Sequence, residues 1–174
     1  VIKDLDLIAK LENDGMKLNI DVFNILELIQ NVFDLLEMKA KKRNITLQFD
    51  QVYEFPVFVK GDIEKIEQVL INLIVNSIKY GNPNGRTMLG VESYNDTKFI
   101  IKIIDNGEGI KKEHISRLFE RFYRVDQSRS REQGGSGLGL SIVKHIIEAH
   151  NENILLKSTY GEGSEFSFTL ENAR

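Results

Sequence analysis

Apolar side chains recur at helical spacing between residues 62 and 80, where they form one face of a predicted helix. The members of this apolar face are Ile66, Leu70, Leu73, Ile74 and Ile78. Similar patterns predict two further helices, at 21–43 and 138–149. Runs rich in β-branched residues predict strands at 45–50, 57–59, 86–94, 97–104, 154–158 and 164–170. This order of elements predicts an α+β fold, a two-layer α/β sandwich with helices on one face of a mixed β-sheet.

The opposite face of the helix at 62–80 is polar. Its stripe consists of Lys65, Gln68, Asn72, Asn76 and Lys79, flanked by Val69 and Tyr80. Asparagine is a mediocre helix former, so two of them one turn apart call for an explanation. Mg²⁺ accepts amide oxygens beside water and phosphates, and we therefore expect Asn76 to hold the metal, Lys79 to meet phosphate and Tyr80 to pack on a base. The alternative is a polar stripe that faces solvent.

A short apolar run ends at Asp105, and Asn106, Gly107, Glu108 and Gly109 follow it. Asp105 is therefore expected at the end of a largely buried strand. A carboxylate there can accept a hydrogen bond from an exocyclic amine, and glycines allow the backbone to approach a flat ring. The adenine amino group fits this description. The alternative is an ordinary tight turn, for which Asp-Asn-Gly is common chemistry.

A second glycine-rich segment, at residues 134–140, leads directly into the apolar pattern of the last predicted helix. Such a segment exposes backbone N–H groups and the positive end of a helix dipole, and both suit phosphate oxygens. No Gly-Lys-Ser/Thr follows it and no strand immediately precedes it. The pattern therefore disfavours a Walker-type loop and a dinucleotide-binding fold.

Residues 111–134, between the two glycine segments, are charged and end in a polar run, a composition that predicts a mobile lid. We expect Phe119 and Phe122 to anchor this lid, and Arg121 or Arg124 to reach a terminal phosphate. The alternative is a solvated loop with two ordinary core aromatics.

Taken in order, these motifs resemble the ATP-binding catalytic domain of two-component sensor histidine kinases, in the superfamily shared with gyrase and the large heat-shock chaperone ATPases. The resemblance covers roughly residues 15–174. The matching segments are 72–80 (asparagine box), 105–110 (first glycine box), 119–126 (phenylalanine box), 135–140 (second glycine box) and 161–166 (closing glycine segment). Residues 119–126 also resemble the orthodox membrane-sensor subgroup, close to phosphate-sensor kinases.

The resemblance implies the Bergerat ATP-binding fold, with ATP and Mg²⁺ as ligands. Asn76 is the implied Mg²⁺ ligand, Asp105 the residue that reads adenine, and Asn72, Lys79 and Arg124 the groups that place phosphates. The implied nucleotide-binding set is Asn76, Tyr80, Asp105, Gly107, Gly109, Ile110, Phe119, Gly135, Gly137, Leu138, Gly139 and Leu140.

One position separates a kinase from its hydrolytic relatives. Those relatives place a glutamate, a general base for water, one turn before the metal-binding asparagine, where this chain has Asn72. An amide cannot accept the proton, so the terminal phosphate is expected to go to another nucleophile. In kinases of this type that nucleophile is a histidine on a separate helical-hairpin domain. The remaining alternatives are a gyrase- or chaperone-type ATPase and a non-catalytic nucleotide-binding module.

Histidine is present at three positions, His114, His145 and His150, and none has the sequence context of a phosphoacceptor. We expect all three to be structural or exposed. The family usually has His-Gly-Gly after the last helix, where residues 150–153 read His-Asn-Glu-Asn. An asparagine must then adopt the left-handed turn.

The first residues form a separate amphipathic pattern. Apolar positions at Ile2, Leu5, Ile8 and Leu11 make a helical stripe that stops at residues 13–15. The stripe resembles the end of the second hairpin helix, which predicts a dimerisation-hairpin remnant with its linker at 1–14 and the catalytic domain at 15–174. The alternative is an end segment that folds back onto the domain.

Composition limits the classes of protein and of binding partner to consider. The 174 residues are 41% hydrophobic and 28% charged, which is ordinary for one globular domain, and the net charge of −3 gives no case for nucleic acid or an anionic membrane. There is no cysteine, which excludes disulfides and thiolate metal sites. The resemblance implies a cytoplasmic domain of a bacterial inner-membrane sensor, homodimeric at full length through its histidine phosphotransfer domain, with a response regulator receiver domain as partner.

Overall fold

The structure, a computed structural model, describes residues 16–123 and 139–173. Its elements in chain order are β1 (Asp21–Asn24), α2 (Ile25–Lys42), β2 (Thr46–Phe49), β3 (Phe58–Gly61), α3 (Ile63–Tyr80), β4 (Arg86–Ser93), β5 (Lys98–Asp105), α4 (Lys112–Ile115), α6 (Gly139–Ala149), β6 (Ile154–Thr159) and β7 (Gly163–Asn172). Apart from the start of the first helix, the predicted helices and strands lie within two residues of these bounds.

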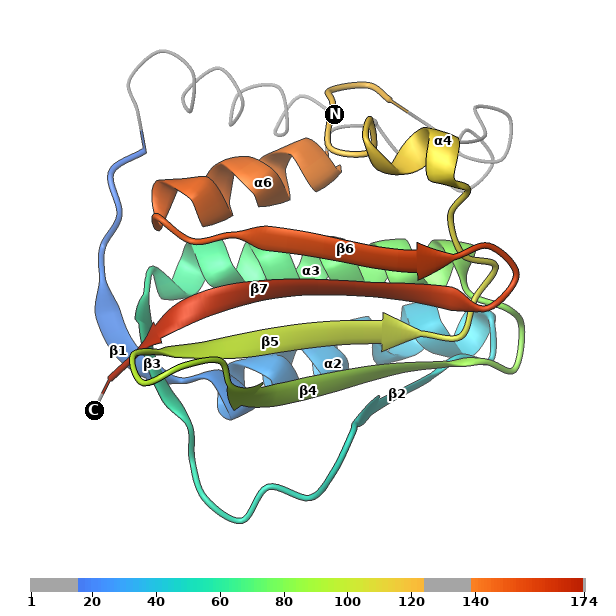
Figure 1. Ribbon diagram of the computed structural model, residues 1–174. Coiled ribbons are helices and arrows are strands. Elements are labelled where there is room, and N and C mark those ends of the chain that lie inside the picture. The colour runs from blue at the N-terminus through green and yellow to red at the C-terminus, as the bar shows by residue number, and fades with distance from the viewer. Residues whose placement is uncertain (1–15, 124–138, 174) are drawn as a thin grey trace.

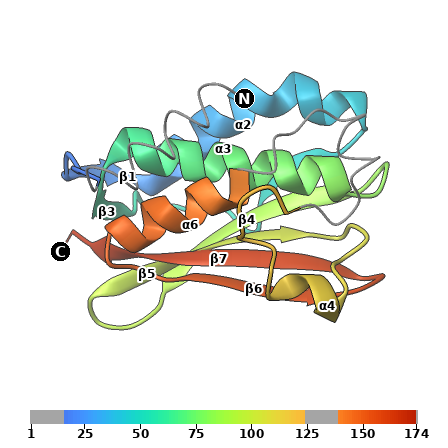
Figure 2. The same cartoon turned by 90° about the horizontal axis from the view of Figure 1, so that it is seen from above.

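The strands form one seven-stranded sheet in the order β1-β3-β7-β5-β4-β2, and β6 also pairs with β7 (Figure 1). The β2–β4 pair is parallel, and the other pairs are antiparallel. Helices α2, α3 and α6 cover one face of this sheet (Figure 2). The predicted two-layer α/β sandwich with a mixed sheet is thereby confirmed.

Residues 21–24 correct the predicted helix at 21–43, because they form strand β1, antiparallel to β3. Asn24 explains where the helix begins: it has extended backbone, and its side-chain oxygen accepts a hydrogen bond from Leu26 N at 3.1 Å. The same oxygen accepts from Val57 N at 3.2 Å, which ties the start of α2 to the chain before β3. Asparagine is a favoured N-cap, so the apolar run on its two sides is divided into a strand and a helix.

The core lies between the helices and the sheet, with α3 packed against both α2 and α6. All five residues of the predicted apolar face of α3 are at most 2% exposed. They meet alternate side chains of the central strands, such as Ile101 of β5 and Phe166 and Phe168 of β7, which are also buried. Burying a side chain of this size contributes roughly 1.5–3 kcal/mol, so this layer fixes where the polar face of α3 lies.

The end of α6 confirms the expectation of an asparagine in a left-handed turn. Asn151 has a φ of 59°, with Asn151 N bonded to Glu148 O at 2.9 Å and Glu152 N to Ile147 O at 3.1 Å. This pair of bonds is a Schellman motif, usually completed by glycine. Glu152 is buried at 8% exposure, and its Oε1 accepts hydrogen bonds from Lys98 Nζ at 2.7 Å and Thr169 Oγ1 at 2.8 Å.

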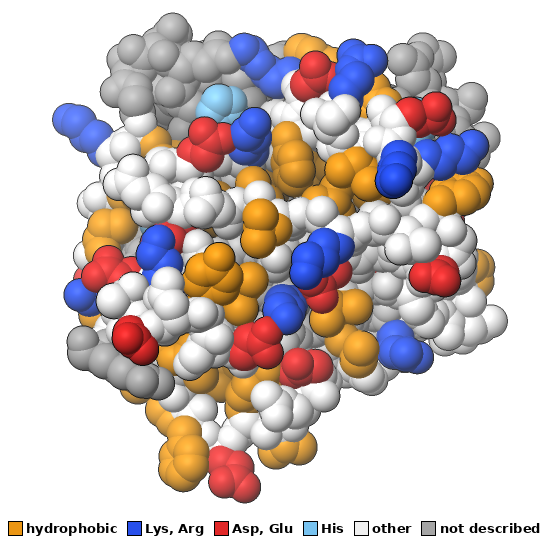
Figure 3. Space-filling view, in the orientation of Figure 1, with side chains coloured by type: hydrophobic (Ala, Val, Ile, Leu, Met, Phe, Trp, Pro, Cys, Tyr) orange, Lys and Arg blue, Asp and Glu red, His pale blue; other side chains and the backbone are white. Residues whose placement is uncertain are grey.

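None of the helices that the structure describes covers the other face of the sheet (Figures 1 and 2). Charges of both signs are interspersed on that face with apolar side chains (Figure 3). Lys102 of β5 and Glu92 of β4 form an ion pair of 2.5 Å across the strands. The pKa of Lys102 is raised, chiefly by its hydrogen bond with Glu92. Within residues 16–123 and 139–173, no helix has both the length and the apolar character needed to cross a bilayer.

Candidate nucleotide-binding site

The polar stripe of α3 lies partly buried rather than open to solvent. Asp62 caps the N-terminus of the helix by accepting a hydrogen bond from Lys65 N at 3.2 Å. The stripe residues Lys65, Gln68, Asn72, Asn76 and Lys79 all have intermediate exposure. None of the five is therefore either fully buried or fully exposed.

Asn72 connects the asparagine helix to the beginning of α6. Its amide nitrogen donates a hydrogen bond to Gly139 O at 3.3 Å. A Cβ placed on Gly139 would lie 3.9 Å from Asn72 Cγ. Gly139, which with Leu140 is the described part of the second glycine box, therefore lies beside the first asparagine of the stripe. Gly135, Gly137, Leu138 and Arg124 lie outside the described residues.

Asp105 ends β5, as predicted, and its carboxylate is held from the backbone. Its Oδ1 accepts hydrogen bonds from Gly107 N at 2.9 Å and from Ser164 N at 3.3 Å. Burial raises the pKa of Asp105, and hydrogen bonds from Gly107, Ser164 and the Ser77 side chain oppose that rise. The group is a fixed, partly buried acceptor, suited to a hydrogen-bond donor such as an amine.

The first glycine box packs against the end of α3. A Cβ on Gly107 would lie 2.6 Å from Tyr80 O, and Glu108 N donates to the same carbonyl at 3.3 Å. Gly109 has a φ of 72°, and a Cβ there would lie 2.2 Å from Thr159 O. The protein's own backbone therefore requires both glycines, a reason additional to the expected approach of a flat ring. Ile110 is held by its N–H, which donates to Ser158 Oγ at 2.8 Å.

The beginning of the predicted lid is anchored by one phenylalanine, not two. Residues 112–115 form the short helix α4, and Leu118 after it is buried. Phe119 packs edge-on against Phe166 of the core, with ring centroids 6.2 Å apart. Phe122 is 57% exposed and has a φ of 63°, so the prediction that it anchors the lid is wrong.

Two of the histidines have structural partners. His114 Nδ1 is hydrogen-bonded to Tyr123 Oη, and the Arg117 guanidinium lies 4.6 Å from the centroid of the same Tyr123 ring. His150 Nε2 accepts from Asp62 N at 3.0 Å, and its Nδ1 lies 2.8 Å from Ile146 O, which ties α6 to the N-terminus of α3. These contacts confirm the structural assignment for His114 and His150, while His145 is partly buried.

Sequence reasoning missed a group of hydroxyls around Asp105. Ser77 Oγ of α3 lies 2.6 Å from Thr87 Oγ1 of β4, and both residues are at most 2% exposed. Ser158 Oγ of β6 lies 2.8 Å from Ser164 Oγ of β7. One signal was available, because Ser77 interrupts the apolar face of α3 beside Ile78.

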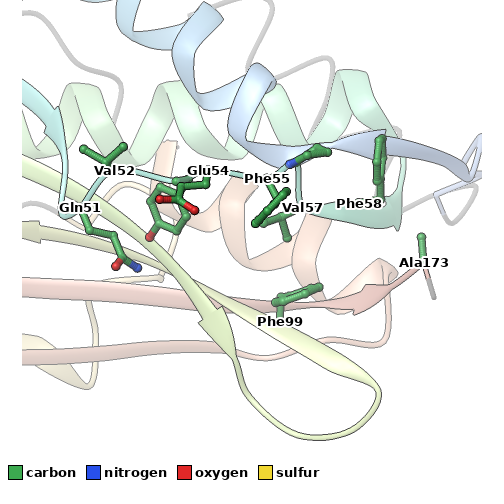
Figure 4. A pocket seen from close by; sticks show the side chains of 10 residues that line it. Gln51, Val52, Glu54, Phe55, Val57, Phe58, Phe99 and Ala173 are labelled. Atoms are coloured by element: carbon green, nitrogen blue, oxygen red, sulfur yellow. The ribbon is translucent and has the colours of Figure 1, made fainter.

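Other parts of the surface contain none of the predicted site residues. Within the described ranges, no group of three or more His, Cys, Asp or Glu could hold a metal ion. A groove of about 500 Å³ lies along the chain between β2 and β3 (Figure 4). Its lining includes Val52, Phe55, Phe58 and Phe99, and none of the predicted site residues.

Comparison with known proteins shows which family this chain belongs to. Residues 61–174 match the family model for histidine kinase-, DNA gyrase B- and HSP90-like ATPases. The sensor protein kinase WalK of Staphylococcus aureus is 35% identical over 173 residues, which are 98% of this chain and 40% of WalK. The chain thus spans less than half the length of this relative.

Solved structures agree with this match. The catalytic domain of histidine kinase ThkA, in a nucleotide-free form, superposes with a TM-score of 0.76 at 32% identity, covering 88% of this chain and 96% of that domain. ThkA is also known in complex with the response regulator protein TrrA. Full-length ShkA in complex with AMPPNP gives a TM-score of 0.87 at 23% identity, covering 99% of this chain and 35% of ShkA, and supports the fold alone.

Proposed function

Because this chain belongs to the histidine kinase-, DNA gyrase B- and HSP90-like ATPase family, on its histidine kinase branch, we propose that it binds Mg-ATP and presents the γ-phosphate to a histidine on a separate domain. The observation that carries this proposal is the convergence of three motifs on α3. Asn72 contacts Gly139 of the second glycine box, and Tyr80 contacts Gly107 of the first. Gly107 and Gly139, which are more than 30 residues apart in sequence, therefore both border α3.

The donors and acceptors around α3 fit a nucleotide. Asp105 offers a fixed carboxylate for the adenine amine, and Tyr80, Gly107, Gly109, Ile110 and Phe119 are the other residues that we propose to contact the nucleotide there. Asn76 is the proposed Mg²⁺ ligand, and an ion held by one amide with phosphates and water needs no carboxylate cluster. When bound, Mg²⁺ supplies neutralisation of phosphate charge. Lys79 and Arg124 are the proposed phosphate contacts, with the second glycine box (Gly135, Gly137, Leu138, Gly139 and Leu140) along the phosphates.

Asn72 favours a kinase over a hydrolase. Its amide nitrogen donates to a backbone carbonyl, a contact that only the NH₂ end of the amide can make. A glutamate at this position would turn a carboxylate toward the Gly139 carbonyl and lose the bond. The contact thus suits an amide, which cannot take a proton from water. This chain then contributes to catalysis by positioning the phosphoryl group and stabilising its charge.

The partners follow from the same proposal. The receiving histidine belongs to a dimerisation domain that makes the full-length protein a homodimer, and a response regulator aspartate receives the phosphoryl group from it. The complex of ThkA with TrrA supports a regulator of this kind. We place the domain on the cytoplasmic side of a bacterial inner-membrane sensor.

Calorimetric titration with ATP and Mg²⁺ tests the site. We expect saturable binding that is weakened about tenfold or more by Asp105→Asn and by Asn76→Asp. A hydrogen bond to a charged group contributes roughly 1.5–3 kcal/mol, and about 1.4 kcal/mol is tenfold in affinity. Asp96→Asn and Asn95→Asp make the same chemical changes at exposed positions of the β4–β5 turn and serve as controls. Wild-type affinity in both site variants would refute the assignment.

A further inference from the structure

The turn between β6 and β7 lies against the first glycine box, residues 105–110 (Figure 1). Gly161 N of this turn donates a hydrogen bond to Glu108 O at 2.7 Å. A Cβ on Gly163 would clash with Asp105 O, and Gly109 has the same constraint from the end of β6. The two backbones are therefore in direct contact, and the position of the glycine box depends on this hairpin.

Ser158, near the end of β6, links the two backbones through its side chain. Its Oγ accepts a hydrogen bond from Ile110 N at 2.8 Å and donates one to Gly163 O at 3.0 Å. Since a hydroxyl has a single proton, the 2.8 Å contact with Ser164 Oγ uses the Ser164 proton. The Ser158 hydroxyl thus uses its proton and both of its lone pairs, which fixes its orientation.

The same set of bonds reaches the other end of the glycine box. Ser164 N donates to Asp105 Oδ1 at 3.3 Å, and the two residues are register partners on β7 and β5. The Ser158 hydroxyl therefore holds Ile110 directly and is connected to Asp105 through Ser164. On its far side the box contacts Tyr80 at the end of α3, so it is packed between that helix and the β6–β7 hairpin.

We propose that Ser158 is a positioning residue for the nucleotide site, whose hydroxyl fixes the backbone of the first glycine box between the β6–β7 hairpin and the end of α3. The inference rests on the proposed nucleotide binding, and Ser158 acts through the Ile110 backbone rather than on the nucleotide. A segment that is already ordered before binding does not have to be ordered by the ligand. Loss of the hydroxyl should therefore weaken binding without abolishing it.

The test measures ATP affinity by calorimetry in the presence of Mg²⁺, amide exchange of Ile110 by NMR, and the melting temperature. Ser158→Ala removes the hydroxyl, whereas Ser158→Thr keeps it and suits a strand. Thr169→Val is the matched control. Thr169 Oγ1 donates to Glu152 Oε1 at 2.8 Å toward the other end of β7, so this variant loses a buried hydroxyl bond away from the glycine box.

We expect Ser158→Ala to weaken ATP binding about three- to tenfold and to speed exchange of the Ile110 amide, while Ser158→Thr stays close to the wild type in both. Thr169→Val should lower the melting temperature and leave ATP affinity unchanged. Wild-type affinity in Ser158→Ala, a loss no larger than that in Thr169→Val, or no recovery in Ser158→Thr would overturn the positioning role and leave the proposed function intact. If the wild type bound no ATP, the proposed function would fail and this inference with it.

Discussion

Asp105 is subject to two opposing requirements. A partly buried carboxyl is more stable when neutral, whereas it accepts the hydrogen bond of an amine more strongly when ionised. The protein resolves the conflict with donors from Gly107, Ser164 and Ser77, yet the pKa of Asp105 still lies above its ordinary value of 3.8 because burial is the larger effect. In its proposed role as the acceptor for the adenine amine, Asp105 sacrifices stability for recognition, as functional sites often do.

The first prediction concerns the stability of the nucleotide-free protein. With a raised folded-state pKa, the Asp105 contribution to stability is fully present below pH 3.8 and is lost as the pH rises through the raised value. At neutral pH the ionised carboxylate therefore costs stability. Asp105→Asn is expected to raise the melting temperature at neutral pH by about 2–4 °C per kcal/mol recovered, although it weakens ATP binding.

Differential scanning calorimetry over a range of pH checks this prediction. The gain should shrink toward acidic pH, where the wild-type carboxyl becomes protonated, and Asp96→Asn should show no such trend. A lower melting temperature for Asp105→Asn at neutral pH would mean that its hydrogen bonds outweigh its burial.

At the scale of elements, the end of α6 provides a second test. Asn151 occupies the left-handed position that completes the Schellman motif. An ordinary side chain there costs roughly 1–2 kcal/mol, asparagine less, and glycine nothing steric. We expect Asn151→Ala to lower the free energy of unfolding by about 1 kcal/mol and Asn151→Gly to keep or raise it. Urea denaturation measures both, and equal destabilisation by the two variants would contradict the motif.

The elements also show what apolar periodicity can predict. It predicted the bounds of α3 closely, because the five residues of its apolar face recur at helical spacing and are all buried. It failed at residues 21–24, where Val22 and Phe23 continue the apolar pattern into α2 but pair with β3. Only Asn24, as an N-cap, marks that boundary in the sequence. Pairing between distant segments is decided by tertiary contacts that local pattern does not contain.

At the scale of the whole molecule, motif order predicted which segments lie together better than residue chemistry did. The asparagine and glycine segments were recognisable because each has an unusual composition, and the fold brings Asn72 to Gly139 and Tyr80 to Gly107. The group of hydroxyls around Asp105 escaped prediction because serine and threonine are unremarkable in sequence. Ser77, Thr87, Ser158 and Ser164 become a group only through the register of four strands and the position of α3. The roles of all the predicted site residues, Asn76, Lys79 and Asp105 among them, and the phosphate-sensor subgroup stay predictions.

The central claim is that this domain directs the γ-phosphoryl group of ATP to a histidine and not to water, and it has a direct test. The chain is mixed with Mg²⁺, γ-labelled ATP and a separately made helical-hairpin domain of the same kinase, with a hairpin lacking the histidine as control. We predict binding with little phosphate release by the chain alone, and label on the intact hairpin only. Steady release of phosphate without the hairpin would contradict the account and move the protein to the ATPase branch, and absence of nucleotide binding would make it a non-catalytic module.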